Sequence, residues 1–493
     1  MNLEQQLLAF GEKPFASPYR SIGVEECKNL YVENSITFTS KVKNYYVSIP
    51  GLKMFIDDTS SGICRGLYRS GNRCFGVFGN QFVEILQSGV KLVRGNLETF
   101  SDTVEFSDNT YQIVLVDGEF GYIFELSTNT FQKLDEDTFP NGSTHITNID
   151  TYFIANVKNS INYQWSDPNN GNVWNPLNFG TKQGQPDNIV ALKDIHNQLW
   201  VFGQYSTEVH YNTGDITTQV WQRYEGAILE IGCAAKYSVA KLQNNLFWLG
   251  ADKTGNIALW TNEGLIPKKV STRGIEQYIK FQVSDVSKAV GYTYSQAGHN
   301  FYIISFVGSN LTLCYDITTD AWHERTYLNE RGSEVRWRGF YSTYCFDKNI
   351  FGDNLSSSLY IADLDYYQND TPGNPSNPNY IKRVRTTPII QSNQKRVRHN
   401  SLQILFEQGT GLITENQLNF GTDPVCILEC SDDSGHTFTN RRIQPIGKIG
   451  TYDFRTRFVG LGHSRNRVYR VTVTDPVKVV LVGCVLSYQE LGF

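Results

Sequence analysis

The stretch at residues 298–325, GHNFYIISFVGSNLTLCYDITTDAWHER, decides which fold the chain is expected to adopt. Residues 301–304 are bulky and apolar at every position, and apolar side chains alternate along residues 311–315. Polar residues at 308–310 and 316–320 suit turns. The stretch predicts three short antiparallel strands whose sheet is apolar on both faces. Such a sheet must be covered by similar sheets on both sides, and radial repetition supplies them.

Six further stretches repeat this pattern of a polar residue, usually Asn, a bulky apolar strand, a short turn and a second strand. The bulky residues that begin the seven strands are Phe75, Tyr111, Tyr152, Leu199, Leu246, Phe301 and Ile350, at intervals of 36 to 55 residues. These intervals bracket the roughly 40 to 50 residues of a four-stranded propeller blade. We therefore expect an all-β chain with an irregular β-propeller of five to seven blades. A large sandwich or two stacked sheets is the alternative.

Composition and spacing divide the chain into four parts. Residues 1–50 are expected to form an N-terminal arm with one strand, and residues 51–365 the propeller body. Residues 366–380, rich in Pro, Asn and Gly, suit a linker or long loop. Residues 381–493 predict a basic antiparallel module like a β-sandwich. Apolar residues at helical spacing over 272–290 predict one short helix between the fifth and sixth blades.

The residue totals agree with a strand-rich chain and show an uneven charge. The chain holds 28 Tyr, 29 Phe and 41 Gly against 2 Met, a balance that favours strands and turns. Its net charge is −5, from 44 Lys+Arg and 49 Asp+Glu. Residues 381–493 contain 15 basic and 9 acidic residues, net +6, so the rest of the chain carries −11. An acidic body with a basic end predicts contacts with differently charged neighbours rather than sequence-specific binding of nucleic acid.

No pattern of residues indicates catalysis, a cofactor or a metal. The nine cysteines include no CxxC pair, and most lie in apolar runs, so buried reduced thiols are expected. Cys426 and Cys430 precede His436, but no fourth zinc ligand follows at a suitable spacing. The sequence contains no HExxH, GxSxG or GxxxxGK[ST] motif. We expect no enzymatic activity, and no insertion into a membrane, because no run approaches about 20 apolar residues.

One turn matches the Asp-box pattern S-x-D-x-G-x-T-[WF] through Ser431, Asp433, Gly435, Thr437 and Phe438. The motif recurs as a structural turn in sialidase propellers. A structural hairpin is the favoured interpretation of this single copy. A glycan-binding or glycan-cleaving propeller protein, similar to sialidases, is the alternative function.

Three basic tracts in the C-terminal module are candidates for a subunit interface. On a strand, the arginines two residues apart share one face. A solvated strand face and a contact with DNA are the alternatives. The candidate residues are Lys382, Arg383, Arg385, Lys395, Arg396, Arg398, Arg465 and Arg467.

A series of segments in a fixed order carries a family resemblance. Pro50-Gly51-Leu52 precedes the first hairpin, and residues 198–209 read QLWVFGQYSTEV. GLIP at 264–267 comes before the expected helix and the opening stretch, and the turn at 431–438 is followed by RVYRV at 467–471. In this order the chain resembles the packaged-DNA stabilisation, or tail hub, proteins of short-tailed bacteriophages (podoviruses).

The resemblance implies a virion protein of the phage tail, made in the host cytoplasm and without enzymatic activity. In that family a homohexameric ring lies below the portal and its adaptor ring. The ring completes the head after packaging and retains the DNA. It also holds the tail needle or plug, gives tailspikes a place to attach, and forms part of the channel for genome ejection. DNA would pass through without sequence-specific binding.

Overall fold

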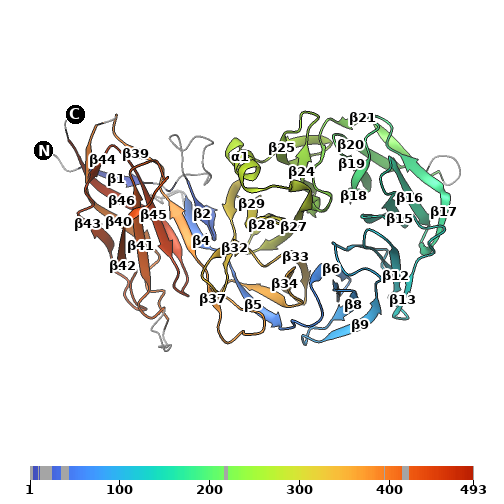
Figure 1. The fold of residues 1–493 in the computed structure, drawn as a ribbon, viewed down its shortest axis with the longest axis horizontal. Coiled ribbons are helices and arrows are strands. Elements are labelled where there is room, and N and C mark those ends of the chain that lie inside the picture. The colour runs from blue at the N-terminus through green and yellow to red at the C-terminus, as the bar shows by residue number, and fades with distance from the viewer. Residues whose placement is uncertain are drawn as a thin grey trace.

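The computed structural model describes residues 4–8, 10, 25–34, 44–215, 220–393, 395–412 and 421–491. Two β-rich bodies lie side by side, a ring of small sheets and a β-sandwich (Figure 1). The predicted fold class, a β-propeller with a C-terminal sandwich, is confirmed. No helix in the described part of the chain is long and apolar enough to cross a membrane.

Seven antiparallel sheets form the blades of the propeller, within the predicted range of five to seven. Blade 1 contains β6 (Cys64–Ser70), β7 (Arg73–Phe78), β8 (Gln81–Ile85) and β9 (Lys91–Asn96). Blade 2 contains β10 (Glu105–Asp108), β11 (Gln112–Val116), β12 (Gly121–Glu125) and β13 (Thr130–Lys133). Blade 3 contains β14 (Ile146–Ile149), β15 (Tyr152–Asn156), β16 (Asn162–Asp167) and β17 (Asn170–Thr181). Blade 4 contains β18 (Ile189–Ile195), β19 (Gln198–Gly203), β20 (Thr207–Asn212) and β21 (Trp221–Leu229).

The last three blades include the stretch that opened the sequence analysis. Blade 5 contains β22 (Gly232–Cys233), β23 (Ala240–Leu242), β24 (Asn245–Ala251), β25 (Ile257–Glu263) and β26 (Ile266–Lys269), with the 3-10 helix η1 (Lys236–Ser238) between β22 and β23. Blade 6 contains β27 (Ala289–Gln296), β28 (His299–Phe306), β29 (Leu311–Asp316) and β30 (Ala321–Glu324). Blade 7 contains β33 (Tyr341–Cys345), β34 (Lys348–Gly352), β35 (Leu359–Asp363) and β5 (Gly51–Ile56). The three strands predicted at 298–325 are therefore β28, β29 and β30.

The propeller closes through β5, which comes from the start of the chain and pairs with β35 at its end. Each pair of neighbouring blades shares one hydrophobic cluster. Phe75 and Phe82 of blade 1 pack with Phe124 of blade 2, for example, and Cys64 of blade 1 packs with Ile350 of blade 7. The apolar residues on both faces of each sheet thus bury each other around the ring, which is why the repeat exists.

The predicted helix is α1 (Arg273–Gln282), between blades 5 and 6. The Thr272 side chain caps it by accepting a bond from the backbone N–H of Ile275, and Ile275 and Ile279 face the core. Helical spacing beyond residue 282 predicted more helix than forms. Only the 3-10 turn η2 (Val286–Lys288) follows before β27 begins, because the apolar residues Ala289 and Val290 belong to β27 in the sheet of blade 6.

The sandwich is built from two sheets around one core. The first contains β3 (Leu30–Asn34), β4 (Asn44–Ser48), β46 (Val480–Glu490), β40 (Val397–Phe406) and β43 (Thr456–Val459), with β1 (Glu4–Leu8) on β46 and β44 (His463–Ser464) on β40. The second contains β2 (Cys27–Lys28), β38 (Arg383–Thr386), β45 (Asn466–Val473), β41 (Val425–Ser431) and β42 (Thr439–Pro445), with β39 (Ile390–Gln391) on β45. Smaller hairpins pair β31 (Thr326–Leu328) with β32 (Glu334–Arg336), and β36 (Gln368–Asn369) with β37 (Asn379–Tyr380).

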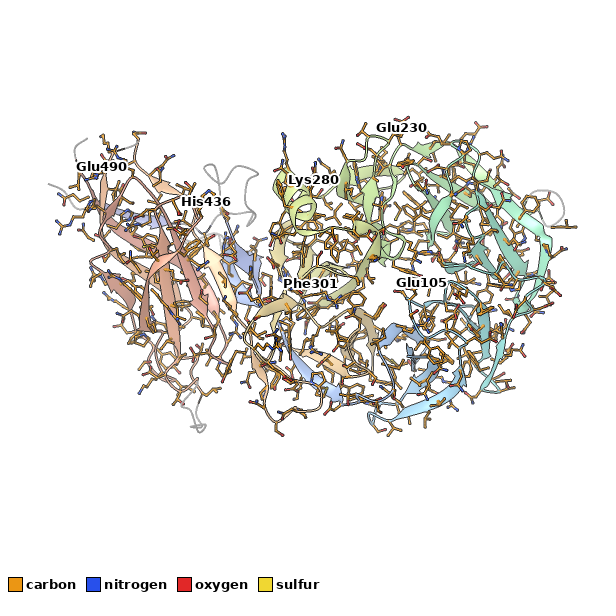
Figure 2. All side chains as sticks on the ribbon, viewed as in Figure 1. Glu105, Glu230, Lys280, Phe301, His436 and Glu490 are labelled. Carbon is orange, nitrogen blue, oxygen red and sulfur yellow. The ribbon has the colours of Figure 1, made fainter. Side chains whose placement is uncertain are left out.

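The N-terminal strands complete the C-terminal sandwich, which differs from the arm expected over residues 1–50. Leu30 and Val32 of β3 enter the sandwich core beside Leu486 of β46. Tyr31, on the opposite face of the strand, packs on Phe301 of blade 6, at 5.7 Å between ring centroids. Strand β3 therefore contributes apolar contacts to both bodies. Strands β2 and β4 lie between the two bodies (Figure 1), and Phe301 lies on the propeller side of the junction (Figure 2).

One continuous sheet runs from the propeller into the sandwich. Strand β30 of blade 6 pairs in parallel with β2, with Lys28 opposite Glu324. Strand β2 pairs antiparallel with β38, so blade 6 and one sandwich sheet form a single ten-stranded sheet. The two bodies are thereby joined through backbone hydrogen bonds as well as side-chain packing.

Candidate functional surfaces

Arg383 and Arg385, predicted to face a neighbouring subunit, are buried inside the chain. Arg383 donates to Ser48 Oγ at 2.6 Å and to the carbonyl oxygen of Asp475 at 2.9 Å. Arg385 is fully buried and donates to the Tyr46 hydroxyl at 3.1 Å. Both side chains tie β38 to the N-terminal strands, so an interface role does not fit their positions.

Arg467 is also buried, in a bidentate ion pair with Asp432. Its Nε and Nη2 lie 2.6 and 2.7 Å from the two carboxylate oxygens. This geometry stabilises the turn after β41 and leaves the guanidinium facing the protein. Arg467 therefore has a structural position and not the exposed one predicted for it.

The other candidates lie nearer the surface. Lys382 forms an ion pair with Glu334, and Lys395 lies 3.2 Å from Glu490. The remaining three, Arg396, Arg398 and Arg465, are exposed. They gather at one end of the sandwich, where Arg398 of β40 lies opposite His463 of β44. Their role in a subunit interface stays a prediction.

The Asp-box-like turn joins β41 to β42 and so belongs to the sandwich, not to the propeller. Asp433 Oδ1 accepts from Ser431 Oγ at 2.6 Å, and Asp433 Oδ2 accepts from the Thr437 hydroxyl at 2.6 Å. The backbone N–H of Gly435 donates to Ser431 Oγ at 2.7 Å. The ring of Phe438 lies 3.8 Å from the Arg470 guanidinium carbon. These bonds hold a tight hairpin turn, and every polar group of the motif is used within it.

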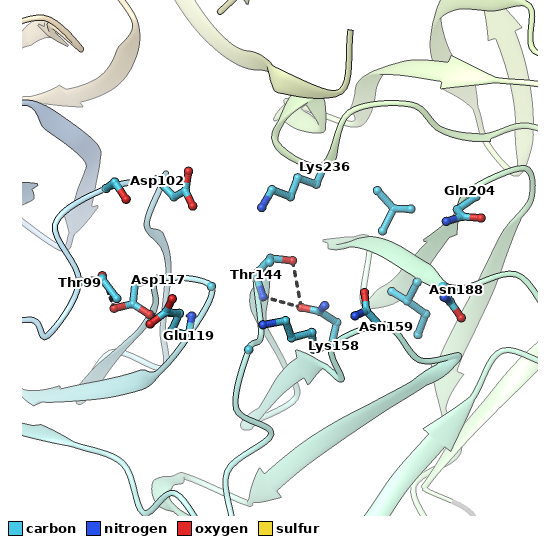
Figure 3. A pocket seen from close by; sticks show the side chains of 16 residues that line it. Thr99, Asp102, Asp117, Glu119, Thr144, Lys158, Asn159, Asn188, Gln204 and Lys236 are labelled. Carbon is cyan, nitrogen blue, oxygen red and sulfur yellow. Dashed lines mark hydrogen bonds between the residues drawn. The ribbon is translucent and has the colours of Figure 1, made fainter. Parts of the chain in front are cut away.

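A polar cavity of about 430 Å³ opens where loops of blades 1 to 5 converge (Figure 3). The acidic side chains of Asp102, Asp117 and Glu119 line one side, and Lys158 and Lys236 line another. The described residues hold no group of three or more metal-ligating side chains that could bind an ion. The volume suits a small molecule or several waters. The cavity is too small to hold duplex DNA, which has a major groove about 12 Å wide.

Asp117 and the neighbouring Arg65 hold the loops on one side of this cavity. Asp117 accepts from Thr99 Oγ1 at 2.6 Å and from the Tyr122 hydroxyl at 3.1 Å. Burial lowers the pKa of Lys236, partly offset by the nearby carboxylate of Asp102. The buried Arg65 donates to the carbonyl oxygens of Thr99 and Asp102 at 2.8 and 2.7 Å. These contacts connect the loop at residues 99–102 to blades 1 and 2.

A second cavity, of about 520 Å³, lies between the outer strands of blades 3 and 4. Its floor is a buried chain of bonds, with the Tyr163 hydroxyl 2.9 Å from His210 Nδ1 and His210 Nε2 3.2 Å from Glu208 Oε2. Burial alone would raise the pKa of Glu208, but bonds from His210 and the Gly184 N–H lower it below its ordinary value. Sequence reasoning missed this site, for which the only signal is Glu208 and His210 two apart on one strand.

The junction between the two bodies holds a buried imidazole between two carboxylates. His299 Nδ1 lies 2.7 Å from Asp316 Oδ2, and Nε2 lies 2.8 Å from Glu33 Oε2. Burial alone would lower the pKa of His299, but the two carboxylates raise it to about 9. His323 stays neutral because burial and the neighbouring Arg325 lower its pKa well below the ordinary value. A protonated His299 therefore links β3 of the sandwich to blade 6.

Comparisons with known proteins match both bodies of the chain. The family model described as bacteriophage P22 Gp10, beta-propeller, matches residues 28–367, and the model described as bacteriophage P22 Gp10, beta-sandwich, matches residues 382–489. No curated protein matches the chain.

Several solved structures are similar at low identity. A chain of the mitotic checkpoint complex is 12% identical with a TM-score of 0.42, over 67% of this chain and 99% of that one. The structure of U3-55K is 11% identical with a TM-score of 0.40, over 64% and 99%. The N-terminal domain of Nup159 is 11% identical with a TM-score of 0.38, over 68% and 98%. TM-scores below 0.5 carry no argument about this chain.

Proposed function

Because the chain belongs to the bacteriophage P22 Gp10 family of structural tail proteins, we propose that it forms the tail hub of a short-tailed phage. In this proposal six copies form a ring below the portal and its adaptor ring. The ring closes the head after packaging, retains the DNA and forms part of the ejection channel. It also holds the tail needle or plug and gives the tailspikes their attachment site.

One observation carries the proposal, namely the collinear match of both family domains along the chain. The propeller model is followed by the sandwich model, and together they span residues 28–489 with one short gap. A likeness in the propeller alone would indicate only an architecture that serves many functions. Here both domains of the family are matched, in succession along the chain.

The fold suits a connector with several neighbours. Seven inter-blade clusters make the propeller a rigid ring, and its loops offer two broad faces for different partners. The small cavity among the propeller loops cannot admit DNA. In the proposed ring, the DNA channel lies between copies of the chain. An acidic lining there would let DNA slide without binding.

Retention of DNA by heads made without this protein tests the proposal. Heads packaged in cells that lack the protein are isolated and treated with DNase, with and without the purified chain. We expect DNase to degrade the DNA of heads to which no protein was added. We expect the DNA to be protected from DNase in heads to which the protein was added. Full retention of DNA by heads that lack the protein would contradict the proposed role.

An assay on purified host-surface polysaccharide separates the glycan-directed alternative. The expected result is no release of sugar over a heat-denatured control. Release that depends on the folded chain would instead favour a sialidase-like activity. The substitution Glu208→Gln, at the only deeply buried carboxylate of the cavity between blades 3 and 4, would then show whether that cavity is responsible.

A further inference from the structure

The two ends of the molecule carry opposite charge. Residues 105–229, which form blades 2 to 4, contain 15 acidic and 5 basic residues, net −10. Residues 381–493 of the sandwich are net +6. Blades 3 and 4 and the outer strands of the sandwich lie at opposite ends of the long axis (Figure 1). Residues 105–137 carry −7 of this net charge, and residues 138–229, which include blades 3 and 4, carry −3. The net negative charge thus lies away from the basic module, a distribution that favours head-to-tail association.

The basic end presents two strand edges together. Strands β42 and β43 are the last strands of the two sandwich sheets, and in the described part of the chain no further strand pairs with their outer sides. Arg442 ties them together by donating to the carbonyl oxygen of Gly460 at 2.9 Å. Ile443 on β42 is 53% exposed and Val459 on β43 is 59% exposed. Exposed apolar side chains on open strand edges favour association with another chain.

The acidic end presents a complementary apolar surface. Strand β17 of blade 3 is 12 residues long, whereas the corresponding β13 of blade 2 has 4. Leu177 and Phe179 on β17 are 81% and 48% exposed. Both residues line the cavity between blades 3 and 4 together with the exposed carboxylate of Glu225. Arg223 also lines the cavity, so the rim offers exposed apolar side chains and one exposed carboxylate to the apolar and basic residues of the sandwich edge.

We propose that the sandwich edge formed by β42 and β43 of one copy docks on the β17 rim of a second copy. The contact is heterologous, because each copy contributes a different surface, so repetition produces a ring if the rotation closes. Exposed apolar residues supply the buried core of the contact, and Arg441 and Arg457 at the basic edge meet the exposed carboxylate of Glu225. The inference rests on the proposed ring and identifies the two surfaces that would build it.

Two variants, each with one defective surface, test the contact. Ile443→Asp places a carboxylate on the basic edge, and Leu177→Asp places one on the rim. Both positions are exposed, so neither change disturbs the core. Phe281→Asp, on α1 and 79% exposed, is the matched control away from both surfaces. Mass is measured by size-exclusion chromatography with light scattering, at about 0.1 M and about 0.5 M salt.

We expect the wild type and Phe281→Asp to form the same multimer, reduced at high salt because charge steers the contact. Each defective variant alone should be monomeric. An equimolar mixture of the two should form a dimer and nothing larger, because only one intact edge and one intact rim can meet.

If Ile443→Asp or Leu177→Asp formed multimers of the same mass as the wild type, the proposed contact would be overturned, but the proposed ring would not be. Absence of the dimer in the mixture would also overturn the contact. A wild type that stays monomeric, with every other tail protein present, would instead overturn the ring itself.

Discussion

Protonation of His299 should stabilise the junction between the propeller and the sandwich in a pH-dependent way. The perturbation is a rise in pH from 6.5 to 9, in the wild type and in His299→Gln. Folding raises the pKa of this imidazole from 6.5 to about 9. A pKa that is higher in the folded state gives stability that is fully present below 6.5 and lost as the pH passes 9.

The magnitude follows from the difference between the two pKa values. A difference of about 2.5, at about 1.36 kcal/mol per pKa unit, corresponds to about 3 kcal/mol. Glu33 is 31% exposed, and solvent there weakens one of the two ion pairs. We therefore expect a loss of about 2 kcal/mol in unfolding free energy between pH 6.5 and pH 9, measured by urea titration with tryptophan fluorescence.

Measurements on His299→Gln and on a control variant show whether His299 causes the loss of stability between pH 6.5 and pH 9. In His299→Gln no proton is taken up, so its stability should be lower at pH 6.5 and nearly constant up to pH 9. His196→Gln, at an exposed histidine, should behave as the wild type. Parallel profiles for the wild type and His299→Gln would refute the assignment of the pH dependence to this imidazole.

Three further substitutions test the closure, the core and the Asp-box-like turn. In Gly51→Ala the new β-carbon would overlap the backbone oxygens of Tyr366 and Gln368, so the melting temperature should fall well below that of Lys53→Ala on the same strand. Ile303→Ala, at a fully buried position of blade 6, should cost about 3 kcal/mol in unfolding free energy, whereas Ile266→Ala, 70% exposed, should change it little. Asp433→Ala removes the acceptor for Thr437, so amide hydrogen exchange should rise at the turn after β41 and stay unchanged in blade 1.

The blades were predictable from sequence because each is a local unit. The apolar residues around Phe301 predict a sheet that is buried on both faces, and the same pattern recurs along the chain with similar spacing. What the sequence did not reveal is pairing between its distant ends. Pro50-Gly51-Leu52 indicates a turn, but nothing local indicates that the strand starting at Gly51 completes a blade with residues 359–363. The same holds for Leu30 and Val32, whose alternation fits any half-buried strand.

The candidate surfaces were harder to predict for a different physical reason. Charged residues are rarely fully buried, so Arg383 and Arg385 were expected at the surface. Arg383 instead donates to the Ser48 hydroxyl and Arg385 to the Glu25 carboxylate, two acceptors from the N-terminal segment about 340 to 360 residues away in the chain. The His299 site has the same origin, because Glu33 and Asp316 are separated in sequence and meet only in the folded molecule.

The pairing of the first strands with the last ones imposes an order on biosynthesis. Strands β1 to β4 leave the ribosome first, yet their partners β38 and β46 emerge near the end of translation. At about 10 residues per second, the apolar residues of β3 remain without the native cover of β46 for about 45 s. Strand β5 likewise has no partner until β35 has been synthesised, so the propeller of a nascent chain cannot close before then. A fragment that begins at residue 381 lacks four strands of the sandwich, β1 to β4. Removal of the strands at either end should therefore destabilise both bodies. We expect the chain to assemble with other copies only after both bodies have folded.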